Sequence, residues 1–246
     1  MGNKTLKIRF LSMFLVITAL IIGVSVATDT RPVLLINGKA YFGYSAKISC
    51  IGSFTKKDLK SLKYMRNLKK AAFIVDELDL EILRRMNNLR ELTIGFRGDY
   101  YIYDWTALNS FKKLEYFNGL NLKMTDLSAF KNMHNLKILY IESVGAANLK
   151  TSIINDISDV KSLTKLERFS ISGKNITDIS CLSNLLELKE LSLFGTNCDN
   201  YSILLKLPKL EHLSIDKGVL TEKEIKMFEE KGVSVTEYER EVEKNE

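Results

Sequence analysis

The side chains that could do chemistry in this chain are few, and the most regular of them are acids. Their spacing is 21, 25, 22, 30, 22 and 22 residues. They are six aspartates, Asp58, Asp79, Asp104, Asp126, Asp156 and Asp178, and an asparagine, Asn200, stands at the seventh position. Carboxylates repeated in this way could bind calcium, take part in acid–base catalysis, or accept backbone N–H bonds at the start of a helical turn. An apolar residue follows each of them directly, so we interpret them as caps of short turns.

Nucleophiles, acid–base groups and metal ligands are otherwise sparse. The two histidines, His134 and His212, do not form a Ser-His-Asp or Cys-His set with their surroundings. The three cysteines lack metal-ligand spacing, and no glycine-rich phosphate loop is present. We therefore predict no enzyme, no cofactor and no metal site. Cys198 falls on an inward position and is expected in the core, whereas Cys181 is expected to face elsewhere.

An apolar ladder defines the elements that position these acids. Residues at +1, +4, +7, +10, +13 and +15 from each acid are apolar or small almost throughout. After Asp126 they are Leu127, Phe130, Met133, Leu136, Leu139 and Ile141. Self-similarity with a period in the low twenties indicates a stacked solenoid. The first part of each repeat has a period near three, which suits a 3₁₀ or short α turn, and the second part alternates like a short strand.

Two motifs carry a family resemblance. L-x-x-L-x-L is present at Leu188, Leu191 and Leu193, and residues 175–182 read Asn-Ile-Thr-Asp-Ile-x-x-Leu. Over residues 58–220 the chain resembles bacterial leucine-rich repeats of the 22-residue, internalin-like kind. The resemblance implies an α/β fold. It would be a leucine-rich-repeat solenoid with a curved parallel β-sheet on the concave face, short 3₁₀/α turns on the convex face, and caps at both ends.

Residues 1–27 have the features of an export signal. Three basic residues among the first nine precede an apolar run from Phe10 to Ala27, which ends in small residues. This pattern is typical of a signal peptide cleaved before Thr28, and an uncleaved membrane anchor is the alternative. Both interpretations predict a secreted or cell-surface protein, with membrane contact only through residues 10–27 if they are retained. The net charge of +6 owes three charges to this segment and does not indicate a nucleic-acid partner.

Both ends of the repeat region are predicted to be caps. Residues 28–57 are assigned to an N-terminal β-hairpin cap, because β-prone runs flank Asn37-Gly38, a strong hairpin signal. Residues 58–220 contain the repeats. Residues 221–246 are assigned to a helical cap with a charged tail, because Thr221 and Glu224 have capping-box spacing and Gly232 can end the helix.

The expected concave face has seven strands, and its middle is rich in aromatic residues. Two long steps between repeats add chain after a strand, at 96–103 and 145–155, and such insertions often lie on a binding side. The candidate partner-binding residues are Phe96, Arg97, Tyr100, Tyr101, Tyr116, Asn118, Tyr140, Glu142 and Arg168. The alternative is that the aromatic residues only cover a widened core.

The resemblance implies a binding module for another protein, acting through the concave face and the rim loop at 96–103. The sequence does not identify that partner. A second hypothesis is a cell-wall or glycan-binding surface protein, in which aromatic rings stack on sugars. A third is a structural spacer without a dedicated ligand.

Overall fold

The computed structural model describes residues 34–36, 39–41, 45–51, 62, 65, 67–97, 102, 104–142 and 153–239. The predicted export segment, residues 1–27, lies outside these ranges, as do Asp58, Tyr100 and Tyr101. Within them, none of the helices has the length and apolar content that crossing a bilayer requires.

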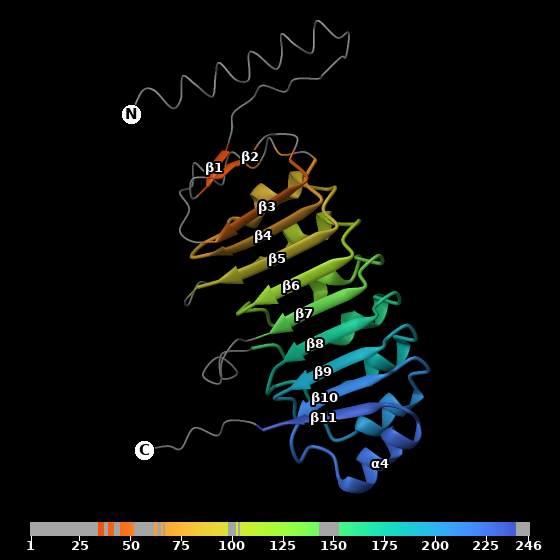
Figure 1. Cartoon of the computed structure of the whole chain (residues 1–246). Coiled ribbons are helices and arrows are strands. Elements are labelled where there is room, and N and C mark those ends of the chain that lie inside the picture. Colours follow the sequence, from red (N-terminus) through yellow and green to blue (C-terminus); the bar gives the residue numbers. More distant parts are fainter. Residues whose placement is uncertain are drawn as a thin grey trace, which may run out of the picture.

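A parallel sheet of nine strands runs through the molecule (Figure 1), and the strands follow one another in chain order. The strands are β3 (Lys47–Ile51), β4 (Lys70–Val75), β5 (Glu91–Phe96), β6 (Tyr116–Leu120), β7 (Ile138–Glu142), β8 (Arg168–Ser172), β9 (Glu190–Phe194), β10 (His212–Asp216) and β11 (Ser234–Tyr238). Every neighbouring pair is parallel and in register, for example Leu92 beside Phe117 and Phe169 beside Leu191. Parallel neighbours need a crossover, and each repeat supplies one.

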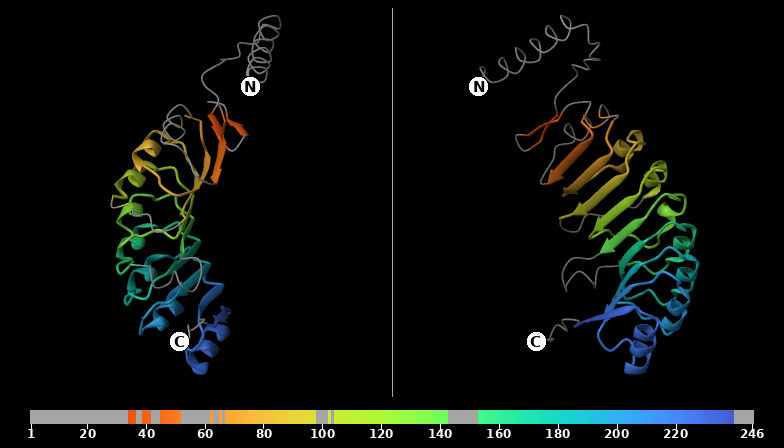
Figure 2. Two further views of the ribbon diagram at one scale, coloured as in Figure 1. Left: turned by 90° about the vertical axis from the view of Figure 1, so that its left-hand side faces the viewer. Right: turned by 45° about the vertical axis from the view of Figure 1, so that its right-hand side comes forward.

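Short 3₁₀ turns form most of the crossovers. They are η2 (Leu80–Arg85), η3 (Thr106–Ser110), η4 (Ser128–Phe130), η5 (Ser158–Ser162), η6 (Ser180–Asn184) and η7 (Tyr201–Lys206). Figure 2 shows them on the outer side of the arc that the chain describes, with the sheet on the inner side. The predicted leucine-rich-repeat solenoid is therefore confirmed.

The apolar ladder fills the space between sheet and turns. Leu92, Leu139 and Leu191 occupy equivalent positions in three repeats, and each is at most 1% exposed. Burial of one such side chain stabilises a fold by roughly 2 kcal/mol. The buried residues form one continuous cluster from Ile48 to Val233, so each repeat shares its core with its neighbours.

The repeated acids cap the turns. The Oδ1 atom of Asp79 accepts the backbone N–H two residues on, at 3.0 Å. Asp104, Asp126, Asp156 and Asp178 do the same at 2.8, 2.9, 2.7 and 2.7 Å. These bonds satisfy N–H groups that the start of a helical turn leaves without an intrahelical partner. The capping interpretation is confirmed for these five aspartates, although only Asp79 is the N-cap residue itself and the other four lie one residue before it. It is wrong for Asn200, whose side chain does not bond a backbone N–H of η7.

The sheet extends beyond the seven predicted strands. Strand β3 lies within the segment assigned to the N-terminal cap, yet it pairs in parallel with β4. The hairpin itself is present: β1 (Leu34–Ile36) pairs antiparallel with β2 (Lys39–Tyr41). At the other end, α4 (Glu222–Glu230) begins with the predicted capping box of Thr221 and Glu224. Strand β11 then closes the sheet beside β10.

Gly119 is the one interior strand position of the ladder without a side chain. A Cβ atom there would lie 2.4 Å from Cδ1 of Leu122 and 3.1 Å from the ring of Phe117. Leu122 is itself buried, and the Phe117 ring packs edge-on against Phe130 with centroids 4.8 Å apart. The missing side chain is therefore replaced by a leucine three residues later, so the core remains filled.

The prediction is wrong for Cys181, whereas Cys198 packs against the core as expected. Cys181 is buried within the core, and its thiol donates to the carbonyl of Ile157 at 3.4 Å. Cys198 is only partly buried. The reason is that η6 packs against η5, so a turn residue that points away from the sheet is covered by the neighbouring turn. Burial raises the pKa of the Cys181 thiol to about 12, which keeps it protonated and unreactive.

Asp126 allows the capping role to be tested against calcium binding. Its carboxylate accepts the Ser128 hydroxyl at 2.5 Å and the Ser128 N–H at 2.9 Å, and these bonds lower the pKa of Asp126 from its ordinary 3.8. A lowered pKa contributes stability that is present above pH 3.8 and is lost as the pH falls through the folded-state value.

We expect Asp126→Ala to lower the free energy of unfolding by about 1 kcal/mol at neutral pH and by less in acid, measured by denaturant titration. Asp126→Asn, which keeps an acceptor oxygen, should lose less. A calcium-dependent rise in stability that either substitution removes would contradict the capping role.

Candidate functional site

The inner face of the sheet carries the residues that alternate with the buried ladder. The middle row of this face reads Ala72, Thr93, Asn118, Tyr140, Ser170, Ser192 and Ser214 from β4 to β10. Tyr140 is the bulkiest of these side chains and lies at the centre of the row. The candidate site is built around it, on strands β6, β7 and β8.

Two tyrosines form the aromatic part of this site. The rings of Tyr116 and Tyr140 meet edge to face, with centroids 6.1 Å apart and an interplanar angle of 86°. Both side chains are half-buried. Partial burial raises the pKa of Tyr116, so its hydroxyl stays protonated at neutral pH. The pair therefore presents apolar ring surface and hydroxyl groups that can donate or accept.

Arg168 gives the site its positive charge. Its Nε atom lies 3.3 Å from Oε1 of Glu190 on the next strand. A hydrogen-bonding contact with Tyr140 raises the pKa of Arg168, with the charge of Glu190 as the second cause. The guanidinium thus lies between an aromatic hydroxyl and a carboxylate, which fixes its position on an open face.

Two buried polar atoms flank Tyr140 without a hydrogen-bond partner among the described residues. Oδ1 of Asn118 lies in the neighbouring strand on one side, and Oγ of Ser170 lies on the other. Ser170 is only 4% exposed. Burying a polar atom without a partner costs about 1–3 kcal/mol, so such atoms are rare in native proteins. Both atoms are closed to solvent, and the Asn118 side chain also hydrogen-bonds Tyr116, so they belong to the packed polar surroundings of Tyr140.

The structure brings five of the nine predicted site residues together. Tyr116, Asn118, Tyr140 and Arg168 form the cluster described above. Glu142 lies at the end of β7, where its charge contributes to the raised pKa of Tyr116. Sequence reasoning missed Ser170, because its burial depends on neighbouring strands.

The predicted rim loop contributes less. Phe96 is 3% exposed, so the expectation that it faces a partner is wrong. Strands β4 and β5 are each one residue longer than β6 to β10, and this last residue of β5, Phe96, pairs with the buried Val75. Arg97 is exposed and forms an ion pair with Asp76 at 2.9 Å. Tyr100 and Tyr101 lie outside the described residues, so their role stays a prediction.

A second aromatic pair, also missed, lies near the C-terminal end of the same face. Phe194 and Tyr238 meet edge to face at 5.5 Å across the end of β10. Between their strands the buried Asp216 accepts the backbone N–H of Gly195 at 2.6 Å. No arginine among the described residues is paired with these two rings, so this pair is the weaker candidate for a binding site.

The titratable side chains of the described residues bear on whether catalysis or metal binding could occur here. No group of three or more His, Cys, Asp or Glu side chains there is placed to hold a metal ion. His134 is exposed, with Nδ1 3.3 Å from the carbonyl oxygen of Ser162, and His212 is exposed on β10. What the cluster around Tyr140 offers is noncovalent recognition by ring surface, hydrogen bonds and one positive charge.

Comparison with known proteins agrees with the fold. No protein-family model matches the sequence, and no curated protein sequence matches it. Among solved structures, an internalin C2 from Listeria monocytogenes matches with a TM-score of 0.56 at 20% identity, over 78% of this chain and 80% of that chain. An internalin (inlF) from the same species has a TM-score of 0.38 at 15% identity, over 74% and 82%. The chain shares the leucine-rich-repeat fold of internalin C2, and the predicted internalin-like resemblance is confirmed.

Ser170→Ala tests whether the buried hydroxyl lacks a partner. Removing it should raise the free energy of unfolding by about 1 kcal/mol, because the cost of desolvating an unsatisfied group disappears. Ser192→Ala, one strand along the same row and half-buried, should change stability by less than about 0.5 kcal/mol. Denaturant titration of the two variants gives both values. A loss of stability in Ser170→Ala would show that the hydroxyl already has a partner in the free protein.

Proposed function

We propose that this chain is a leucine-rich-repeat binding protein that recognises another protein through the inner face of its sheet, at strands β6 to β8. One observation carries the proposal. The half-buried Tyr116–Tyr140 pair lies with Arg168 around the centre of the middle row, whose other side chains are smaller. A partner that covers Tyr140 would bury both rings and could bond their hydroxyl groups.

The residue types support a protein as the partner. Tyrosine and arginine are enriched at the energetic centres of protein interfaces, where large side chains are buried with few rotamers lost. Here Tyr116, Tyr140 and Arg168 lie together at mid-sheet, and the half-buried Ile138 and Leu120 add apolar area beside them. The serines towards the C-terminal end of the row would then lie at the margin of the interface.

Glycan binding is the second candidate function, and tyrosines are the observation that favours it. Sugars stack on flat ring faces, but Tyr116 and Tyr140 lie perpendicular to each other, so they do not form one platform. This geometry favours a protein partner over a sugar polymer. A spacer without a ligand would have no need for two tyrosine rings at the centre of the inner face.

The proposal includes export, on the basis of residues 1–27. A basic start, an apolar run and small residues at 25 and 27 support a signal peptide cleaved before Thr28. Intact mass of the protein recovered from cells and medium tests this point. We expect the mass of the chain that begins at Thr28. Recovery of the full 28.1 kDa chain from the membrane fraction would favour a retained anchor.

Paired substitutions test the inner face. Immobilised chain beginning at Thr28 is exposed to a proteinaceous surface extract and, separately, to purified peptidoglycan. We expect Tyr116→Ala/Tyr140→Ala to fold and to lose capture of a specific protein by more than tenfold, because each central aromatic contributes on the order of 2 kcal/mol to an interface.

The matched control is Ser192→Ala/Ser214→Ala, which alters two other positions of the middle row. This variant should bind nearly as well as the unmodified chain. Equal capture by the tyrosine variant and the unmodified chain would exclude the proposed surface. Retention on peptidoglycan that depends on the tyrosines would favour the glycan function instead.

A further inference from the structure

A second surface of the molecule carries an unbalanced charge. It lies along the side of the sheet where the chain enters each strand, and it comprises the residues one and three positions before strands β4 to β10. We call it the entry edge. Backbone hydrogen bonds already join the repeats here, such as the N–H of Glu115 to the carbonyl of Arg90 at 2.8 Å. The side chains of the entry edge are therefore not needed to hold the backbone together.

Towards the C-terminal end the entry edge is neutralised within itself. Lys189 lies 3.0 Å from Glu167, and Lys209 lies 2.6 Å from Glu187. Each lysine has a carboxylate on the preceding repeat. The residues directly before β8, β9 and β10 also alternate between negative and positive charge, since they are Glu167, Lys189 and Glu211.

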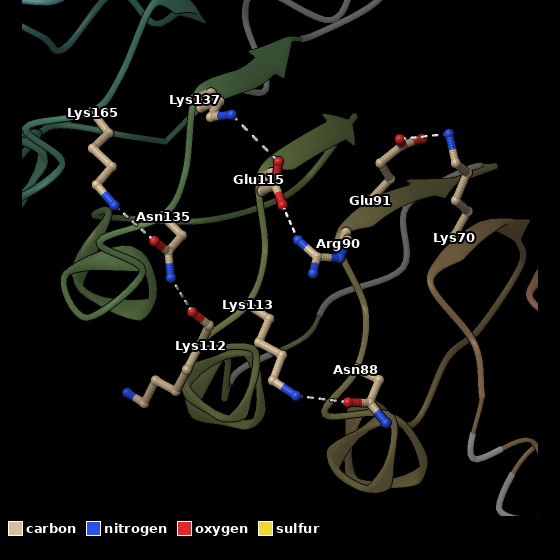
Figure 3. Close-up of polar contacts among 10 residues, drawn as sticks. All are labelled: Lys70, Asn88, Arg90, Glu91, Lys112, Lys113, Glu115, Asn135, Lys137 and Lys165. Carbon is tan, nitrogen blue, oxygen red and sulfur yellow. Dashed lines mark hydrogen bonds and ion pairs between the residues drawn. The ribbon is translucent and has the colours of Figure 1, made fainter.

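Towards the N-terminal end this balance is lost, as Figure 3 shows. Lys113 donates to Oδ1 of Asn88 at 2.8 Å. The equivalent acceptor for Lys209 is the carboxylate of Glu187, so here a neutral amide takes the place of a carboxylate. Lys165 likewise donates to Oδ1 of Asn135 at 2.9 Å. Neutral amides accept the hydrogen bond but leave the positive charge uncompensated.

The single carboxylate of this part is shared. Glu115 pairs with Arg90 and also lies 3.5 Å from Lys137. Lys69, the neighbour of Arg90 in the same row, has no ion pair with any of the described residues. Along the entry edge of β4 to β7, one acid therefore faces several exposed cations. Like charges on neighbouring elements repel, so an anionic occupant would relieve a cost already present in the free protein.

An open groove lies at this place. It is lined by Asn67, Lys69, Asn88, Arg90 and Lys113, together with Ala46. Successive repeats are about 4.8 Å apart, so three cations on successive repeats span about 10 Å. Alternate side chains of an extended peptide are about 6.7 Å apart on one side, which lets two carboxylates reach three such cations. The side-chain amide of Asn67 in the groove can bond peptide N–H and C=O groups, a feature that a phosphate polymer would leave unused.

We propose that this groove is a docking surface for an acidic segment of a protein, bound in extended conformation along the entry edge. Charge complementarity carries the proposal, since the same edge is neutralised by its own carboxylates further along. The surface is separate from the tyrosine cluster of the inner face. The two proposals can therefore fail independently.

Labelled poly-L-glutamate is the probe, and its binding to the full chain is measured by fluorescence anisotropy at low and at physiological salt. The test variant is Lys69→Gln/Lys113→Gln. The control is Lys189→Gln/Lys209→Gln, which removes the same charge from the same two rows of the entry edge. We expect roughly tenfold weaker binding in the test variant, less than about twofold in the control, and weaker binding at higher salt.

Three outcomes would overturn the proposal. Equal loss in the test and control variants would show attraction to net charge without a site. Tighter binding of inorganic polyphosphate of matched charge would assign the groove to phosphate polymers. Loss of poly-L-glutamate binding in Tyr116→Ala/Tyr140→Ala would place the acidic chain on the inner face. Equal unfolding midpoints of the two lysine variants exclude misfolding as the cause.

Discussion

The structure depends on one constraint: no repeat can bury its own apolar residues without the repeats on either side. Each repeat contributes a strand and a short turn, and the leucines between them are covered by the next repeat. The aspartates before η2 to η6 each accept the N–H two residues on, so five turns begin with the same hydrogen bond. The caps complete the arrangement, with α4 covering the last repeat through Phe228.

Because the apolar ladder residues alone fill the core, the outward-facing residues can differ between repeats. The entry edge shows this most clearly, since equivalent positions hold Asn88, Lys113 and Glu187. The middle row of the inner face shows it too, changing from Tyr140 to serine within one repeat step. Two features of these surfaces are not explained by folding: the half-buried tyrosine pair at Tyr140, and Lys69 and Lys113, which have no ion pair with a carboxylate of the described residues. Both proposals assign those features to contact with another molecule.

Sequence periodicity predicted the interior well, because each inward position is decided by residues within its own repeat. It failed where a neighbouring repeat decides the outcome. Cys181 is buried by the turn before it, and Phe96 is drawn into the core by an extra residue of pairing with β4. Strand β3 was missed because its pairing partner, not its own pattern, places it in the sheet. For the same reason the site was predicted in part: Tyr116 and Tyr140 were visible as aromatic residues, whereas Ser170 becomes notable only once it is known to be buried.

We propose that recognition occurs on the inner face around Tyr140. Amide hydrogen exchange of the chain, with and without a captured protein partner, tests this directly, since the readout maps contact without altering any residue. We expect partner binding to slow exchange in β6, β7 and β8, while the turns η3 to η5 on the outer side exchange as before. Slowed exchange confined to those turns, with the three strands unchanged, would contradict it.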